Sequence, residues 1–123
     1  MANNDWTQKE VELIVADYFE MLQSELEDKD YNKTAHRTAL LQVIKRSEAS
    51  IEFKHRNISA VLINMGLPYI RGYKPLFNYQ KQLLEIQVSN YLNNSQATFE
   101  KDFENFNEKL SEISFRKSSV ISD

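Results

Sequence analysis

The sequence predicts an all-α fold, a single-domain bundle of about five helices. Gly and Pro number only two each among 123 residues, which is too few turn formers for a many-stranded sandwich or barrel. Apolar residues make up 41% of a chain of one-domain length, enough to bury a single core. They also recur at steps of three and four along several segments. We therefore expect a helical domain over residues 1–114 and a flexible tail or the start of a linker over 115–123.

The first helix is predicted to begin after Thr7, which forms a capping box with Glu10. Helical spacing gives this helix one apolar face, made of Val11, Ile14, Val15, Tyr18, Phe19, Leu22 and Leu26. The acids between these positions, Asp17 and Glu25 among them, are predicted to form a solvated surface.

The next two helices follow from their caps. Asn32 is predicted to cap a second helix that ends near Lys45–Arg46. Its apolar stripe is shorter and consists of Ala35, Ala39, Leu40, Leu41 and Ile44. A third helix is expected from Ser47 or Ser50 to Gly66, because glycine suits the left-handed conformation that often ends helices. Its first turns, at 51–53, could instead be extended.

Residues 67–77 contain both prolines and a glycine, and they predict one long aromatic and basic loop between the third and fourth helices. Asn78 is the predicted cap of the fourth helix, whose apolar residues are Leu83, Leu84, Ile86, Val88 and Leu92. A fifth helix capped by Ser95 is expected to repeat Phe99, Phe103, Phe106, Leu110 and Ile113 as a core or dimer face.

The net charge of −3 conceals an uneven distribution. Residues 1–30 hold nine acids and two lysines, residues 31–81 hold nine Lys or Arg and two acids, and residues 82–123 hold seven acids and four bases. The local charges are thus −7, +7 and −3. The middle block could bind a polyanion, or the acidic segments could neutralise it within the fold.

Motifs for catalysis are lacking in the sequence. It contains no cysteine, no phosphate-binding glycine loop, no GxSxG and no HExxH. His36 and His55 show no ligand-like spacing and are expected to form hydrogen bonds or face solvent. A weaker hypothesis is a metal-dependent nuclease fragment that uses Glu48, Glu52 and His55. We expect no catalytic residue, no metal and no cofactor.

The basic block interleaves cations with aromatic rings and amides, a composition that suits phosphates and flat bases. The predicted nucleic-acid contacts are Arg46, Lys54, His55, Arg56, Asn57, Arg71, Tyr73, Lys74, Asn78 and Tyr79. DNA is the expected partner. The alternative is a protein-interaction or dimerisation module that acts through the Phe99/Phe103/Phe106 helix or the aromatic loop.

Several runs resemble one known family. They are 6–11, 15–22, 31–33, 36–37, 40–41 and above all 46–62 (RSEASIEFKHRNISAVL), followed by 66–70 (GLPYI), 72–75 (GYKP) and 78–80 (NYQ). Over about residues 6–86 the chain resembles the N-terminal helical domain of bacterial HNH-type restriction endonucleases, which also occurs in proteins with a NO VEIN-type C-terminal nuclease-like domain.

The resemblance implies a DNA-recognition or targeting role in a restriction or defence system, with the nuclease domain further along a longer parent chain. The HNH signature itself is absent from these residues. No run approaches 18 consecutive apolar residues, and the acidic, polar start is unlike a signal peptide, so a cytoplasmic protein without membrane contact is expected.

Overall fold

The computed structural model describes residues 5–94, 102, 104–105 and 108. These residues form four helices and no strand: α1 (Gln8–Leu26), α2 (Lys33–Val43), α3 (Glu48–Asn64) and α4 (Lys81–Asn94). The all-helical prediction is therefore confirmed for this part of the chain. The expected fifth helix lies almost entirely outside the described residues, and its three phenylalanines and the tail 115–123 lie wholly outside them.

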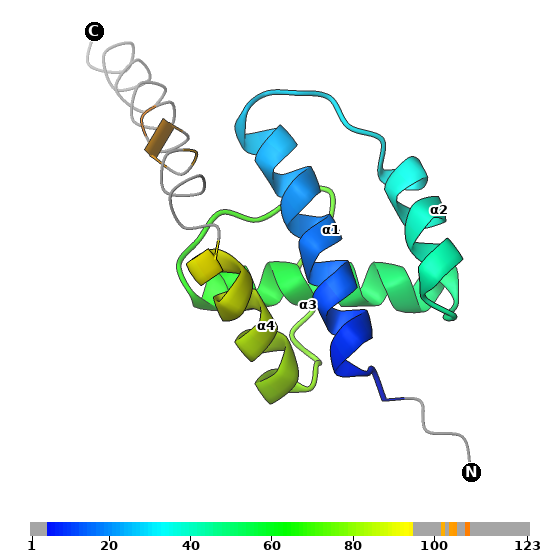
Figure 1. The fold of residues 1–123 in the computed structure, drawn as a ribbon. Helices are drawn as coiled ribbons and strands as arrows, with labels where there is room; N and C mark the ends of the chain where they lie inside the picture. The colour runs from blue at the N-terminus through cyan, green and yellow to red at the C-terminus, as the bar shows by residue number, and fades with distance from the viewer. Residues whose placement is uncertain (1–4, 95–101, 103, 106–107, 109–123) are drawn as a thin grey trace, which may run out of the picture.

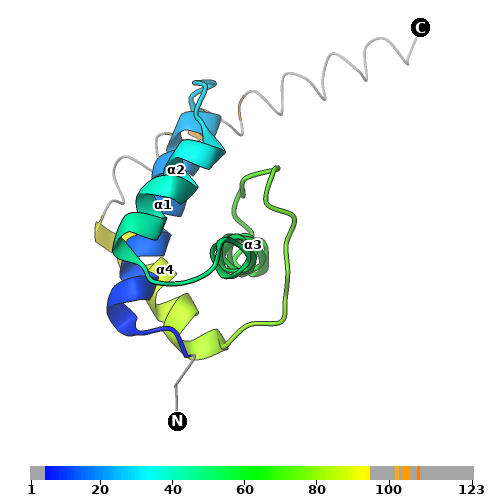
Figure 2. The same cartoon turned by 90° about the vertical axis from the view of Figure 1, so that its right-hand side faces the viewer.

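The helix α1 contacts each of the other three helices, and α3 also contacts α2 and α4. In Figure 1, α1 crosses in front of α3, with α2 and α4 on its two sides. Figure 2 looks along α3 and shows α1, α2 and α4 on one side of it. The connecting loop, residues 65–80, passes on the other side of α3. The core therefore lies between α3 and the remaining helices.

The capping box of α1 forms as the sequence predicts. The Thr7 hydroxyl accepts a hydrogen bond from the Glu10 N–H at 3.2 Å, and the Glu10 carboxylate accepts one from the Thr7 N–H at 2.9 Å. All seven predicted apolar positions of this helix are buried, together with Met21. Burial on this scale explains how α1 serves as the common partner of the other helices.

The helix α2 is shorter and more exposed than its sequence suggests. The Asn32 side chain caps it by accepting from the Ala35 N–H, but the helix ends at Val43, before the predicted end. Only Leu40 within it is buried, while Ala35 and Ala39 face solvent. Because α2 lies at the edge of the bundle, one row of apolar side chains is enough to attach it.

The helix α3 begins at Glu48 after a Ser47 cap, so residues 51–53 are helical. Its end is a Schellman motif: Gly66 has φ 73°, its N–H bonds the Ile63 carbonyl, and the Leu67 N–H bonds the Leu62 carbonyl. Every residue from 57 to 62 is buried. Over these six residues α3 is covered all round, so the polar side chains among them must find partners inside the protein.

The helix α4 begins at Lys81 rather than directly after Asn78. Leu84 and Val88 join the core, whereas Ile86, another apolar residue of this helix, is 47% exposed. None of the helices in the described part of the chain is long and apolar enough to cross a membrane.

Candidate nucleic-acid interface

The connecting loop is fixed to the bundle at its first half by buried side chains. The Tyr18 hydroxyl lies 2.7 Å from the Ser59 hydroxyl and accepts a hydrogen bond from the Ile70 N–H at 2.9 Å. The Glu25 carboxylate accepts from the Arg71 N–H at 3.1 Å. Burial raises the pKa of Tyr18 far above its usual range, so this hydroxyl stays neutral. Two side chains of α1 thus hold the loop backbone at Ile70 and Arg71.

The second half of the loop is held through its carbonyl oxygens. The Lys33 ammonium donates to the Gly72 carbonyl at 2.9 Å, Arg56 Nε donates to the Lys74 carbonyl at 2.9 Å, and Asn57 Nδ2 donates to the Leu76 carbonyl at 2.7 Å. The Leu76 N–H returns a bond to the Arg56 carbonyl at 3.1 Å. Side chains of α2 and α3 therefore bond to every second carbonyl from 72 to 76.

Beneath this loop, one carboxylate joins two histidines. Asp17 Oδ1 lies 2.6 Å from Nδ1 of His36 and Oδ2 lies 3.0 Å from Nε2 of His55, and we assign the ring nitrogens as the donors and the carboxylate as the acceptor of both hydrogen bonds. The His55 ring is fully buried, and its centre lies 4.7 Å from that of Tyr73. The expectation of hydrogen-bonding histidines is confirmed. Asp17, predicted as a solvated acid, instead lies in the interior with only 12% of its side chain exposed.

Three predicted contact residues, His55, Asn57 and Tyr73, are buried and support the loop from within. Their interpretation as surface groups that touch a base or phosphate is wrong, since less than a twentieth of each is exposed. Two of them have hydrogen-bond partners inside the protein: His55 bonds to the Asp17 carboxylate, and Asn57 bonds to the Leu76 carbonyl. For Tyr73, burial raises the pKa to about 12, with the Asp17 charge as the next cause.

Two more predicted residues, Arg46 and Lys54, lie at what we call the Trp6 end: Trp6, Glu10, Arg46 and Lys54. Arg46 makes a two-pronged ion pair with Glu10, at 3.0 and 3.1 Å, and its guanidinium lies 4.7 Å from the Trp6 ring centre. The Lys54 ammonium lies 5.0 Å from the same ring. The Arg46 hydrogen bond holds the pKa of Glu10 below 4.5, whereas burial and then the Arg46 charge lower the pKa of Lys54.

The remaining five predicted residues reach the surface of the loop side. Arg71, Lys74 and Asn78 are exposed, and Arg56 and Tyr79 are partly buried. Asn64 Nδ2 donates to the Tyr79 hydroxyl at 3.4 Å. These are the members of the predicted set that a polyanion could reach.

The structure adds two cations that the sequence reasoning missed, Lys33 and Arg37 of α2. The Lys33 ammonium lies 4.0 Å from the Tyr73 ring centre, which places it beside the loop. Arg37 follows four residues later on the same face of α2, and its charge acts to lower the Tyr73 pKa. The sequence does contain an indication of these cations, because the segment Lys33–Val43 has two cations and no acid. We define the basic face as Lys33, Arg37, Arg56, Arg71 and Lys74. Within the described residues, none of these five side chains forms an ion pair with a carboxylate.

Three carboxylates lie near the basic face. Asp17 is bonded to two histidines, and Glu25 accepts from the Tyr31 hydroxyl at 2.6 Å as well as from the Arg71 N–H. Burial and the Glu25 carboxylate raise the pKa of Tyr31 well above its usual range. Glu52 is exposed and close enough to raise the Tyr73 pKa. The local charge of five cations and three carboxylates is positive.

The hypothesis of a metal site at Glu48, Glu52 and His55 is wrong for this structure. His55 is buried and bonded to Asp17, whereas Glu48 and Glu52 are exposed. In the part of the chain that the structure describes, no group of three His, Cys, Asp or Glu could hold a metal ion.

Comparison with known proteins gives no relative. No family model matches the chain, and no curated protein and no solved structure matches it.

Proposed function

We propose that this chain is the DNA-binding, target-recognition module of a restriction or defence-type nuclease, and that it holds DNA phosphates on the basic face. The observation that supports this is the convergence of five cations from α2, α3 and the connecting loop, none of them paired with a carboxylate in the described residues. Phosphate contacts of Lys and Arg supply most of the affinity of such modules.

The order of the loop also supports the proposal. Hydrogen bonds from Tyr18, Lys33, Arg56 and Asn57 fix its backbone, so Arg71 and Lys74 extend from a defined chain. Exposed Asn78 and half-buried Tyr79 at the end of the loop are suited to contact bases or sugars. The chain has no catalytic role in this proposal: cleavage belongs to a nuclease domain of a longer parent chain, as the resemblance to HNH-type endonucleases implies.

A second candidate is a protein-interaction module without nucleic-acid contact. It is favoured by Phe77, an aromatic residue of the connecting loop that is 53% exposed, and by Phe53, which is 49% exposed on α3. Sedimentation velocity over a range of concentrations separates the two candidates. A monomer at every concentration that still binds duplex DNA contradicts a homodimerisation role.

The direct test is fluorescence anisotropy of a labelled 20-base-pair duplex, titrated with protein at two salt concentrations. The double variant Arg71→Glu with Lys74→Glu is expected to lose at least about tenfold in affinity, because two phosphate contacts become repulsive. Both side chains are exposed, so the fold should be retained.

A matched control is Lys9→Glu with Lys45→Glu, which changes the net charge equally. Both residues are exposed. They lie at the Trp6 end: Lys9 adjoins Glu10 and Lys45 adjoins Arg46. At 0.15 M salt the screening length is about 8 Å, so this control should leave affinity within about twofold. Equal losses in the two variants would contradict a localised interface, and unchanged affinity in the first would contradict the basic face.

A further inference from the structure

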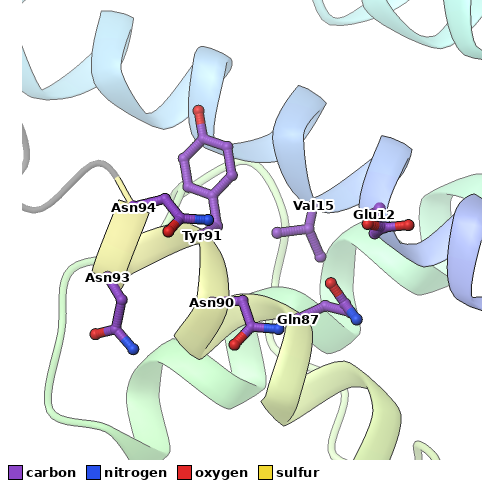
Figure 3. A pocket seen from close by; sticks show the side chains of 7 residues that line it. All are labelled: Glu12, Val15, Gln87, Asn90, Tyr91, Asn93 and Asn94. Carbon is purple, nitrogen blue, oxygen red and sulfur yellow. The ribbon is translucent and has the colours of Figure 1, made fainter.

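A cavity of about 360 Å³ opens between α1 and α4. Its lining side chains come from these two helices: Figure 3 shows Glu12 and Val15 on α1, and the other five residues on α4. The volume is within the range of small-molecule sites. Nothing in the proposed function uses this cavity, because the basic face comes from α2, α3 and the connecting loop, none of which supplies a lining residue.

The cavity wall is unusually rich in carboxamides. Of its seven lining residues, four are Gln or Asn: Gln87, Asn90, Asn93 and Asn94. Positions 87, 90 and 94 follow the spacing i, i+3, i+7, which places their side chains on one face of α4. Each carboxamide offers donors and an acceptor in one plane.

Gln87 is the one buried polar residue among the seven that line the cavity. The residue is only 8% exposed, and its carboxamide is not among the buried polar groups that lack a partner, so solvent in the cavity still reaches it. The close-up shows its side chain on the side of α4 that faces Val15 and Glu12 (Figure 3). A ligand that displaces this solvent must replace its hydrogen bonds to the carboxamide, which favours a ligand edge with both donors and acceptors.

The remaining lining residues restrict the ligand. None of the seven is basic, so the cavity offers no counter-charge for a phosphate or carboxylate. The exposed Glu12 carboxylate accepts hydrogen bonds only, which favours a ligand with N–H donors. Tyr91 supplies a flat ring, held parallel to Phe19 with a centre distance of 4.7 Å.

We propose that this cavity binds an amino-bearing nucleobase, adenine or cytosine, either as a free nucleoside or as a base exposed in single-stranded nucleic acid. Asn and Gln carboxamides pair with the amino and ring-nitrogen edge of adenine, and a carboxylate accepts from the exocyclic amine of cytosine. Uracil and thymine, which lack that amine, bind more weakly. This site is separate from the basic face and does not depend on the proposed function.

The test is an NMR titration of the ¹⁵N-labelled full chain with adenosine, cytidine, uridine and methyl glucoside. Adenosine and cytidine are expected to shift the side-chain amide signals of Gln87 and Asn90, and uridine to do so several-fold more weakly. A short oligodeoxyadenylate distinguishes the sources: if it saturates the same signals at lower concentration than adenosine, the base is taken from a strand, and if not, the nucleoside is the ligand.

Gln87→Leu is expected to raise the adenosine dissociation constant by at least about tenfold, because it removes the central amide. Gln82→Leu is the matched control, since Gln82 is on the same helix but exposed and outside the cavity lining. Glu12→Gln, at an exposed position that tolerates substitution, is expected to reduce the preference for adenosine over uridine.

No shift with millimolar nucleoside, an equal response to methyl glucoside, or shifts confined to residues 70–78 would each overturn the proposal. The double variant Arg71→Glu with Lys74→Glu should bind adenosine normally, so loss of the DNA interface and loss of the cavity site are distinguishable.

Discussion

The Trp6 end and the basic face contain the same types of residue but differ in how their charges are compensated. At the Trp6 end, Glu10 pairs with Arg46 and the indole ring covers both cations. At the basic face, Asp17 is bonded to two histidines and Glu25 to a tyrosine and a backbone N–H, while exposed Glu52 forms no ion pair with the five cations in the described residues. The two regions lie at opposite ends of α1. Glu10 belongs to the Trp6 end and Glu25 lies near the basic face, and fifteen helical residues separate them by roughly 22 Å along the helix axis.

This difference resolves the ambiguity of the +7 block over residues 31–81. The acidic first helix neutralises that block at the Trp6 end but not at the connecting loop. A charge count along the chain therefore identifies a possible polyanion partner, whereas the pairing of individual carboxylates decides which cations are free for it.

Asp17→Ala is expected to have the largest effect, a loss of about 3 kcal/mol in the free energy of unfolding. The change leaves two histidine N–H groups without an acceptor, and one of them, on His55, is fully buried. Urea unfolding followed by the fluorescence of Trp6, the single tryptophan, measures it. Glu20→Ala, at an exposed acid of the same helix, should change stability by less than about 0.5 kcal/mol. Similar losses in both variants would show that Asp17 does not support the loop.

Asn57→Ala is expected to lower the free energy of unfolding by about 1.5 kcal/mol and to loosen the loop, because the Leu76 carbonyl loses its donor. Faster hydrogen exchange at the Leu76 N–H would report the local effect. Gln42→Ala, at an exposed amide of α2, is the control with little expected change. If Leu76 exchange is equally slow in both variants, the loop is held by other contacts.

Lys33→Met is expected to weaken duplex binding about fivefold and to reduce the salt slope by about one, since one phosphate contact is lost. The methionine stem can still cover Tyr73, and the Gly72 carbonyl that loses its donor belongs to an exposed residue, so stability should fall by no more than about 1 kcal/mol. Anisotropy titrations at four salt concentrations give the slope, with Lys9→Met as control. An unchanged slope would exclude Lys33 from the interface.

Arg46→Met is expected to have the smallest effect, about 0.5 kcal/mol of stability at neutral pH, and to leave DNA affinity within about twofold. Arg46 holds the folded-state pKa of Glu10 below its ordinary 4.5, so this stabilisation is complete above pH 4.5 and is lost as the pH falls through the lower folded value. The stability curves of the two proteins should therefore converge in acid. If Arg46→Met reduced the affinity for DNA as much as Lys33→Met does, the Trp6 end would belong to the interface.

The sequence predicted local features well where neighbours in the chain determine them. The Thr7–Glu10 capping box and the left-handed Gly66 depend on residues within one or two turns, and both form as expected. Binding residues were harder, because a polar side chain looks the same whether it faces solvent or a distant internal partner. The buried Asn57 bonds to a carbonyl nineteen positions away in the chain, and the buried His55 bonds to a carboxylate thirty-eight positions away.

The carbonyl bonds at 72, 74 and 76 also determine what the connecting loop can offer to a polyanion. Three oxygens that would repel phosphate accept hydrogen bonds from Lys33, Arg56 and Asn57 instead. The outer side of the loop therefore presents donors and cations on a backbone that is already ordered. Association with such a surface requires little further loss of chain entropy, so the loop acts as a preorganised rather than an adaptive recognition element.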